Sequence, residues 1–114
     1  MTENASREAR SEVTLVALLY LHAGRNEEYE RFESAASRIM GRYGGRIEHR
    51  IRLSGDADAP SSAGPVQPDE VHVVSFPDAA SFARYRADPE IRALADLRAA
   101  AIRDTVVWQG ARSS

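Results

Sequence analysis

The apolar and polar positions of this chain divide it into two similar halves. The first half has an apolar run, an amphipathic segment and an alternating segment, at 13–22, 26–44 and 46–53. The second half has an apolar run, a helical region pinched at Asp88-Pro89 and a shorter apolar run, at 71–76, about 79–103 and 105–108. Short apolar or alternating runs are typical of strands, and a period of 3.6 residues is typical of helices. Each half therefore predicts strand, helix and strand.

Together the two halves predict an α+β fold, a ferredoxin-like βαββαβ sandwich. Right-handed crossovers and short connections give a four-stranded antiparallel sheet of order 4-1-3-2, with two helices on one face. The run at 13–22 is apolar at both parities and predicts a central strand, whereas the alternation at 46–53 predicts an edge strand. Three of the four strands are apolar on both faces. The face without helices is therefore expected to be covered by a second copy of the chain, which makes a homodimer.

Length and composition narrow the class of protein further. The 114 residues suit one domain at 13–110, between a flexible tail at 1–12 and a short tail at 111–114. The segment 54–68 is rich in proline, serine and alanine and is expected to be a mobile loop. A net charge of −2 and the lack of cysteine disfavour a nucleic-acid binder and exclude a thiolate metal site. Since no apolar run is long enough to span a bilayer, we expect a cytoplasmic protein without a membrane partner.

Several short motifs spread between Val13 and Gly110 resemble one family. They are Tyr43-Gly44-Gly45-Arg46 with Arg50, then Ser75-Phe76-Pro77, Asp88-Pro89-Glu90, Leu94, Arg98 and Gly110. This set resembles the DUF1330 family of the dimeric α/β-barrel (ferredoxin-like) superfamily. Ser75 stands where that family usually has glutamate, and Gln109 replaces another glutamate. The resemblance therefore implies the fold more strongly than a shared catalytic carboxylate.

The superfamily includes cofactor-free monooxygenases, polyketide cyclases, muconolactone-type isomerases, haem-degrading enzymes and dye-decolourising peroxidases. The resemblance thus implies a cofactor-independent monooxygenase, cyclase or isomerase of secondary metabolism that acts on a small aromatic or polyketide-like molecule in a cleft. The alternative is a non-catalytic binding or accessory protein of the same fold. We expect no cofactor, because no histidine has the context of a haem ligand. We also expect no metal, because no histidine or carboxylate set has ligand spacing.

The parity of the first strand selects the candidate catalytic residues. Matching the strand to the family places Leu19 and Leu21, with Ala17, beneath the helices, which leaves Tyr20 and His22 for the opposite face. A His–Tyr pair in a cleft can act as general base and hydrogen-bond donor. The alternative is a strand-end histidine in solvent and a tyrosine that anchors the dimer.

Three further residues are candidates for substrate binding. Arg50 shares the polar parity of its strand with Glu48, where it could clamp a carboxylate or phenolate; the alternative is an Arg–Glu ladder on an edge strand. Ser75 falls on the cleft side by parity but has no base nearby in sequence, and Trp108 is either core or cleft wall. His72 shares the parity of the apolar residues in its strand, so we expect it to bond to the backbone.

Overall fold

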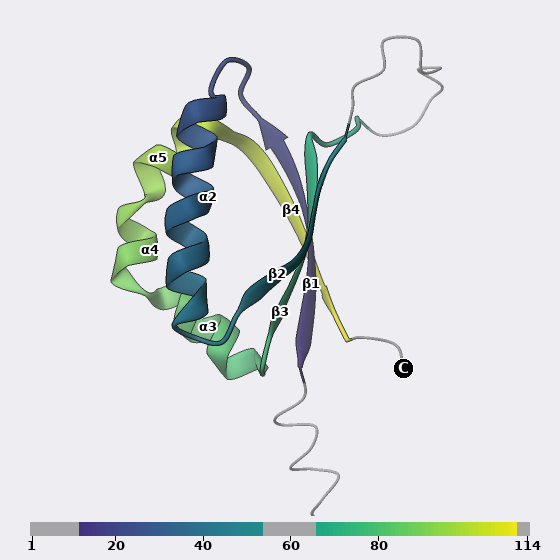
Figure 1. Cartoon of the computed structure of the whole chain (residues 1–114), viewed down its shortest axis with the longest axis vertical. Coiled ribbons are helices and arrows are strands. Elements are labelled where there is room, and N and C mark those ends of the chain that lie inside the picture. Colours follow the sequence, from purple (N-terminus) through teal and green to yellow (C-terminus); the bar gives the residue numbers. More distant parts are fainter. Residues whose placement is uncertain (1–11, 54–65, 112–114) are drawn as a thin grey trace, which may run out of the picture.

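The computed structural model describes residues 12–53 and 66–111. Its elements in chain order are β1 (Val13–Leu21), α2 (Asn26–Gly41), β2 (Arg46–Arg52), β3 (Glu70–Phe76), α3 (Ala79–Ala87), α4 (Pro89–Ala93), α5 (Ala95–Ala101) and β4 (Ile102–Gly110). The strands form one antiparallel sheet, and the helices lie on one side of it (Figure 1). The order β2-β3-β1-β4 is the predicted order read from the other edge, so the ferredoxin-like fold is confirmed. Most of the predicted tails and most of the loop at 54–68 lie outside the described residues.

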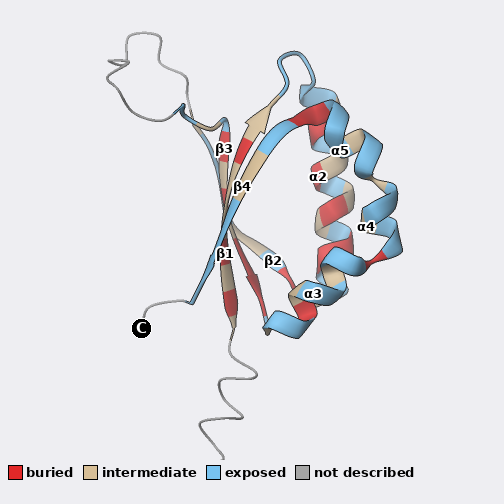
Figure 2. Ribbon diagram, turned by 180° about the vertical axis from the view of Figure 1, so that it is seen from behind, coloured by how far each residue is buried: buried red, intermediate tan, exposed pale blue. Residues whose placement is uncertain are grey.

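β1 is central, and its alternate residues divide between the two faces as predicted. Leu15 packs in a buried cluster with Met40 of α2 and Phe76 of β3, and Leu19 packs against Tyr29 of α2. Figure 2 shows the buried segments concentrated on the sheet and on α2, while α4 is largely exposed. The core therefore lies between the inner face of the sheet and α2.

Two glycines of the family motif serve the turn between α2 and β2. Gly44 has φ +74, a left-handed conformation that glycine adopts without steric cost. A Cβ on Gly45 would lie 2.4 Å from Cε1 of Phe76 and 2.5 Å from Cγ of Met40. These two positions thus have a structural reason to be glycine, and neither lies at a helix N-terminus where it would bind phosphate.

The second helical region differs from the single segment predicted at about 79–103. Asp88 ends α3, and its carboxylate accepts a hydrogen bond from the backbone N–H of Glu90 (2.7 Å), which starts α4 behind Pro89. A further break at Leu94 separates α4 from α5. β4 begins at Ile102, three residues before the predicted start, because Ile102 pairs with β1 and fills the core beside Leu19.

A register shift in β2 overturns its predicted alternation. The shift falls between Ile47 and His49, so one extra residue breaks the period of two. Ile47 packs against the core beneath the helices, whereas Glu48 and His49 both lie on the opposite face. Arg50 then returns to the helix side. The prediction that Arg50 and Glu48 share a face is therefore wrong.

The sheet face away from the helices is mostly apolar, and we call it the open face. Cross-strand pairing puts these residues on it: Val16, Leu18, Tyr20, Val71, Val73, Val106 and Trp108. Trp108, opposite Val16, is 60% exposed rather than part of the core. No described element covers the open face. Within the described ranges, no helix is long and apolar enough to cross a membrane.

Candidate active site

A cavity of about 350 Å³ lies between the inner face of the sheet and the helices. Most of its wall is apolar and comes from β1, α2, β3 and α3, including Leu15, Ala17, Ala36, Met40, Val74 and Phe82. Val107 of β4 lines the cavity and is nevertheless 49% exposed, so the cavity opens beside β4. Its size is at the lower end of the range for small-molecule sites, which suits a ligand of one or two rings.

Two ionisable side chains line the floor of this apolar cavity. Glu33 projects from α2 and is 9% exposed, and His72 projects from β3 and is 4% exposed. Nδ1 of His72 lies 3.8 Å from Oε1 of Glu33, longer than a hydrogen bond but close enough for strong coupling. Burial raises the pKa of the Glu33 carboxyl, against the opposing influence of His72 and Arg50. Glu33 is therefore more readily protonated than an exposed glutamate.

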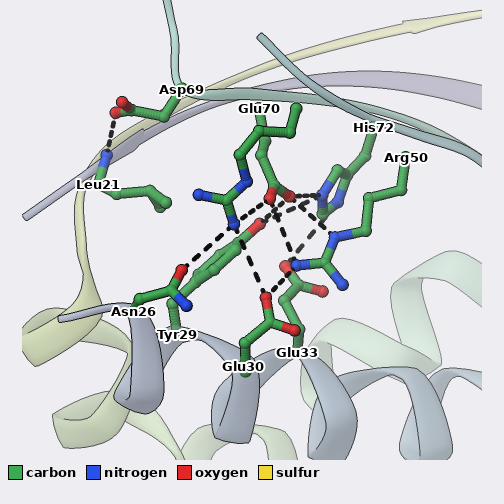
Figure 3. Close-up of polar contacts among 10 residues, drawn as sticks. Leu21, Asn26, Tyr29, Glu30, Glu33, Arg50, Asp69, Glu70 and His72 are labelled. Carbon is green, nitrogen blue, oxygen red and sulfur yellow. Dashed lines mark hydrogen bonds and ion pairs between the residues drawn. The ribbon is translucent and has the colours of Figure 1, made fainter. Parts of the chain in front are cut away.

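A second carboxylate, Glu70, lies behind His72 and is held by several donors (Figure 3). Nε2 of His72 is 2.8 Å from Oε1 of Glu70, and the Tyr29 hydroxyl donates to the same oxygen at 2.6 Å. Arg50 Nε lies 2.9 Å from Oε1, and an Arg52 nitrogen lies 2.5 Å from Oε2. Burial alone would raise the pKa of Glu70, but the hydrogen bonds from Arg50, Tyr29 and His72 outweigh it and lower the pKa to about 2. Glu70 is therefore ionised at neutral pH.

The charge of Glu70 decides which ring nitrogen of His72 carries a hydrogen. An ionised carboxylate only accepts hydrogen bonds, so Nε2 of His72 carries the hydrogen of their contact. Nδ1 of His72 then faces Glu33 on the cavity side. His72 thus lies between the ionised Glu70 on one side and Glu33 in the cavity on the other. Such an arrangement is suited to acid–base chemistry.

Tyr85 of α3 adds a phenol to the cavity wall. Its ring packs against Phe76 with centroids 5.4 Å apart. Burial, together with the nearby Glu33 carboxylate, raises the pKa of Tyr85 to about 12, although Arg98 opposes this shift. The hydroxyl therefore stays protonated at neutral pH, and it can donate a hydrogen bond to a ligand oxygen.

The two predicted catalytic residues lie away from this cavity. Tyr20 is on the open face, where its hydroxyl donates to the Val66 carbonyl (3.1 Å) and the Arg103 guanidinium lies over its ring. His22 follows β1 in an exposed turn, and its backbone N–H donates to the Ala101 carbonyl (2.9 Å). Neither side chain lines the cavity beneath the helices, so their catalytic role stays a prediction that would need a site on the open face.

The predicted substrate-binding residues are divided between the two faces. Ser75 is buried on the open face and donates to Glu48 (3.2 Å), and Trp108 shares this face with Tyr20. Arg50 lies beneath the helices instead, where it binds Glu70 and Glu30. The structure therefore does not bring Arg50 to the rim of a cleft with Tyr20, because the β2 register shift turns it to the other face.

The sequence interpretation missed Glu33 and Glu70 and misjudged His72. His72 is buried as expected, but its ring bonds the Glu70 and Tyr29 side chains rather than the backbone. A signal for both acids was present: each occupies an apolar position of its element. Glu33 interrupts the buried stripe of α2, and Glu70 shares the parity of the buried residues of β3.

This antiparallel sheet order, with helices on one face, defines a ferredoxin-like α+β protein. The RPA0582 protein of unknown function from Rhodopseudomonas palustris is similar, with TM-score 0.76, 16% identity, and 99% of this chain and 91% of that chain covered. SnoaB, a cofactor-independent oxygenase from Streptomyces nogalater, is similar with TM-score 0.64, 20% identity and 91% and 96% covered. A dimeric ferredoxin-like protein of unknown function from Bacteroides fragilis is similar with TM-score 0.62, 11% identity and 89% and 96% covered. At these identities, the likeness shows the fold alone.

The chain itself belongs to the DUF1330 family, a domain of unknown function, whose family model matches residues 15–111. The resemblance inferred from the short motifs is thereby confirmed. No match was found among curated proteins.

Proposed function

We propose that this protein is a cofactor-independent enzyme that removes a proton from a small aromatic or polyketide-like molecule bound in the cavity. Oxygenation, cyclisation and isomerisation of such a molecule can each begin with that step. The observation that carries the proposal is the Glu33–His72 pair on the floor of an apolar cavity, backed by the ionised Glu70. The same fold in SnoaB, a cofactor-independent oxygenase, is consistent with the proposal.

The cavity supplies both a base and a hydrogen-bond donor for proton transfer. With His72 holding its Nε2 hydrogen on Glu70, the Glu33 carboxylate can take a proton from a carbon next to a carbonyl. The raised pKa of Glu33 makes it a stronger base than an exposed glutamate. The Tyr85 phenol is available to donate to the developing enolate oxygen. The enolate then regains a proton elsewhere in an isomerase, attacks a second carbonyl in a cyclase, or reacts with O₂ in a monooxygenase.

Exchange of carbon-bound hydrogen for deuterium tests this step without knowledge of the natural substrate. We expect the protein to accelerate loss of the α-proton signals of 2-tetralone in D₂O, followed by NMR. Glu33→Gln keeps the shape of the side chain but removes the base, so the acceleration should fall by the ~10²–10⁴-fold typical of a lost general base. Glu27→Gln, an exposed change on the same helix, is the matched control and should exchange like wild type.

The outcome also separates the enzyme from the alternative function. If 2-tetralone perturbs cavity methyl signals such as Ala36 but exchanges at the buffer rate, the cavity binds without catalysis. The non-catalytic binding or accessory protein would then be favoured. Equal rates for wild type and Glu33→Gln would contradict the role of Glu33.

We also infer that two copies of the chain associate through their open faces. The support is the apolar character of that face, which holds Leu18, Val73 and the half-exposed Trp108. A monomer seldom exposes an apolar surface of this kind. The dimeric state named for the Bacteroides fragilis relative agrees with this inference.

A further inference from the structure

The mouth of the cavity carries positive charge, whereas the floor carries Glu33 and His72. Arg86 of α3 and Arg98 of α5 both line the cavity and are both exposed, which puts them at its rim. All 15 basic residues of the chain are arginines, so the residue type by itself does not single out these two.

Arg86 and Arg98 are distinguished by a place in the cavity lining together with the lack of an ion pair; the other described arginines lie outside that lining. Six arginines bind carboxylates, namely Arg25, Arg38, Arg42, Arg46, Arg50 and Arg52. Among the described residues, neither Arg86 nor Arg98 has a carboxylate partner. Two guanidinium groups at the mouth of an apolar cavity thus remain available to an anion.

We propose that the ligand of this cavity is an aromatic carboxylate, whose ring enters the apolar interior while Arg98 and Arg86 hold its charge at the rim. This inference deepens the proposed function and rests on it only for the reaction that follows binding. Arginine is suited to the task because its planar fork can donate two parallel hydrogen bonds to a carboxylate.

Local contacts hold both guanidinium groups near the mouth. A terminal nitrogen of Arg98 donates to the Thr105 hydroxyl on β4 (2.9 Å), which ties α5 to the strand beside the opening. The Arg86 guanidinium lies 5.5 Å from the centre of the Phe82 ring, so its flat side is against an aromatic wall. Each group keeps further N–H donors for a ligand.

The charges also give the ligand a direction. An ionised Glu33 repels a carboxylate, so the anionic end belongs at the rim and the reacting carbon at the floor. Tyr85 lines the same cavity as Glu33 and Arg98, and its phenol responds to both, since Glu33 raises and Arg98 lowers its pKa. A ligand of one or two rings that passes Tyr85 would therefore connect the arginines with the Glu33–His72 pair.

Two probes of equal size test the anion preference: 2-naphthoate and its uncharged amide, 2-naphthamide. We expect titration calorimetry at neutral pH and low salt to show tighter binding of 2-naphthoate to the full chain, by roughly 10–100-fold for charge-assisted hydrogen bonds. Arg98→Met keeps most of the side-chain volume and should remove most of this preference, while its affinity for 2-naphthamide stays within about twofold of wild type. Arg86→Met should reduce the preference less, because this arginine has no contact with β4 in the described structure. Arg92→Met, an exposed change on α4 away from the cavity, is the matched control and should bind like wild type.

Equal affinity of wild type for the two probes, or binding of neither, would overturn the inference. So would an undiminished preference in Arg98→Met. Failure of the proposed function gives a different result. A retained preference for 2-naphthoate without accelerated deuterium exchange would contradict the enzyme alone. Accelerated deuterium exchange without a preference for 2-naphthoate would contradict only the role of Arg98 and Arg86 in binding a carboxylate.

Discussion

Both faces of the sheet are largely apolar, but they differ in the polar groups that they hold. The face beneath the helices holds Glu70, His72 and Arg50, linked to one another by side-chain contacts. The open face holds Leu18 and Val73 among a mostly apolar set. The face that the helices cover therefore combines the apolar core with buried, linked charges, whereas the open face leaves apolar side chains uncovered in the described structure.

The difference separates two reasons for burial. Ionised groups can be buried only if they are paired and hydrogen-bonded, and Glu70 meets this condition through Arg50, Arg52, Tyr29 and His72. A packed apolar core would do the same structural task with less desolvation, so the charged cluster agrees with the chemistry proposed for the cavity. The uncovered apolar face agrees with the proposed interface.

The largest expected effect is at the open face. Leu18→Asp places a carboxylate opposite Val71 and Val106 at the middle of the central strand. If two copies meet there, each dimer buries two unpaired charges, and the dissociation constant should rise by about 10³-fold or more. Light scattering at micromolar concentration should then report the 12.5 kDa chain instead of a dimer of twice that mass.

The control for this prediction is Ala99→Asp, which adds the same charge on the exposed side of α5 and should stay dimeric. A wild-type chain that scatters as a monomer would contradict the interface. So would a Leu18→Asp variant that remains a dimer.

The next effect concerns the charged cluster beneath the helices. Because the pKa of Glu70 falls from 4.5 to about 2 on folding, its ionised form stabilises the folded state by about 3 kcal/mol. This contribution is complete above pH 4.5 and disappears as the pH falls from there towards 2. Glu70→Gln lacks it, so the gap in unfolding free energy between wild type and variant should be about 3 kcal/mol at pH 7. The gap should narrow steadily below pH 5.

Urea unfolding at a fixed protein concentration measures this gap at each pH. Glu33 acts in the opposite direction, because its raised pKa favours folding in acid, and it is present in both proteins. Glu27→Gln is the control and should follow wild type across the range. A gap that is constant with pH would show that Glu70 is not held as a low-pKa carboxylate.

Much of the fold could be predicted because the hydrophobic pattern and the family resemblance led to the same arrangement of strands. β1 is apolar at both parities over most of its length, so its central position and the facing of Leu19 and Leu21 followed from the run and the family match. The β2 register shift could not be predicted, since Ile47 and His49 fit a regular alternation in sequence. Only pairing with β3 reveals the extra residue, and that one residue moved Arg50 to the other face.

The candidate site was harder to predict for a related reason. Its groups come from α2 and β3 and meet through tertiary packing, so no motif spacing records them. Glu33 and Glu70 each place an acid at a position that the pattern assigns to the core. An acid at such a position is a weak indication of a functional site. The parity of β1 favoured Tyr20 and His22 instead, and the described residues form no buried charged cluster around either side chain.

The smallest expected effect tests whether the open face has a catalytic role. Tyr20→Phe removes the hydrogen bond to the Val66 carbonyl, and His22→Ala removes an exposed side chain. Since neither residue lines the cavity beneath the helices, we expect both variants to exchange 2-tetralone protons within about twofold of wild type, far from the ~10²–10⁴-fold loss of a missing general base. Light scattering of the same samples checks that the dimer is intact. A loss of exchange comparable to that of Glu33→Gln, with the dimer preserved, would move the active site to the open face and restore the His–Tyr pair as its acid–base group.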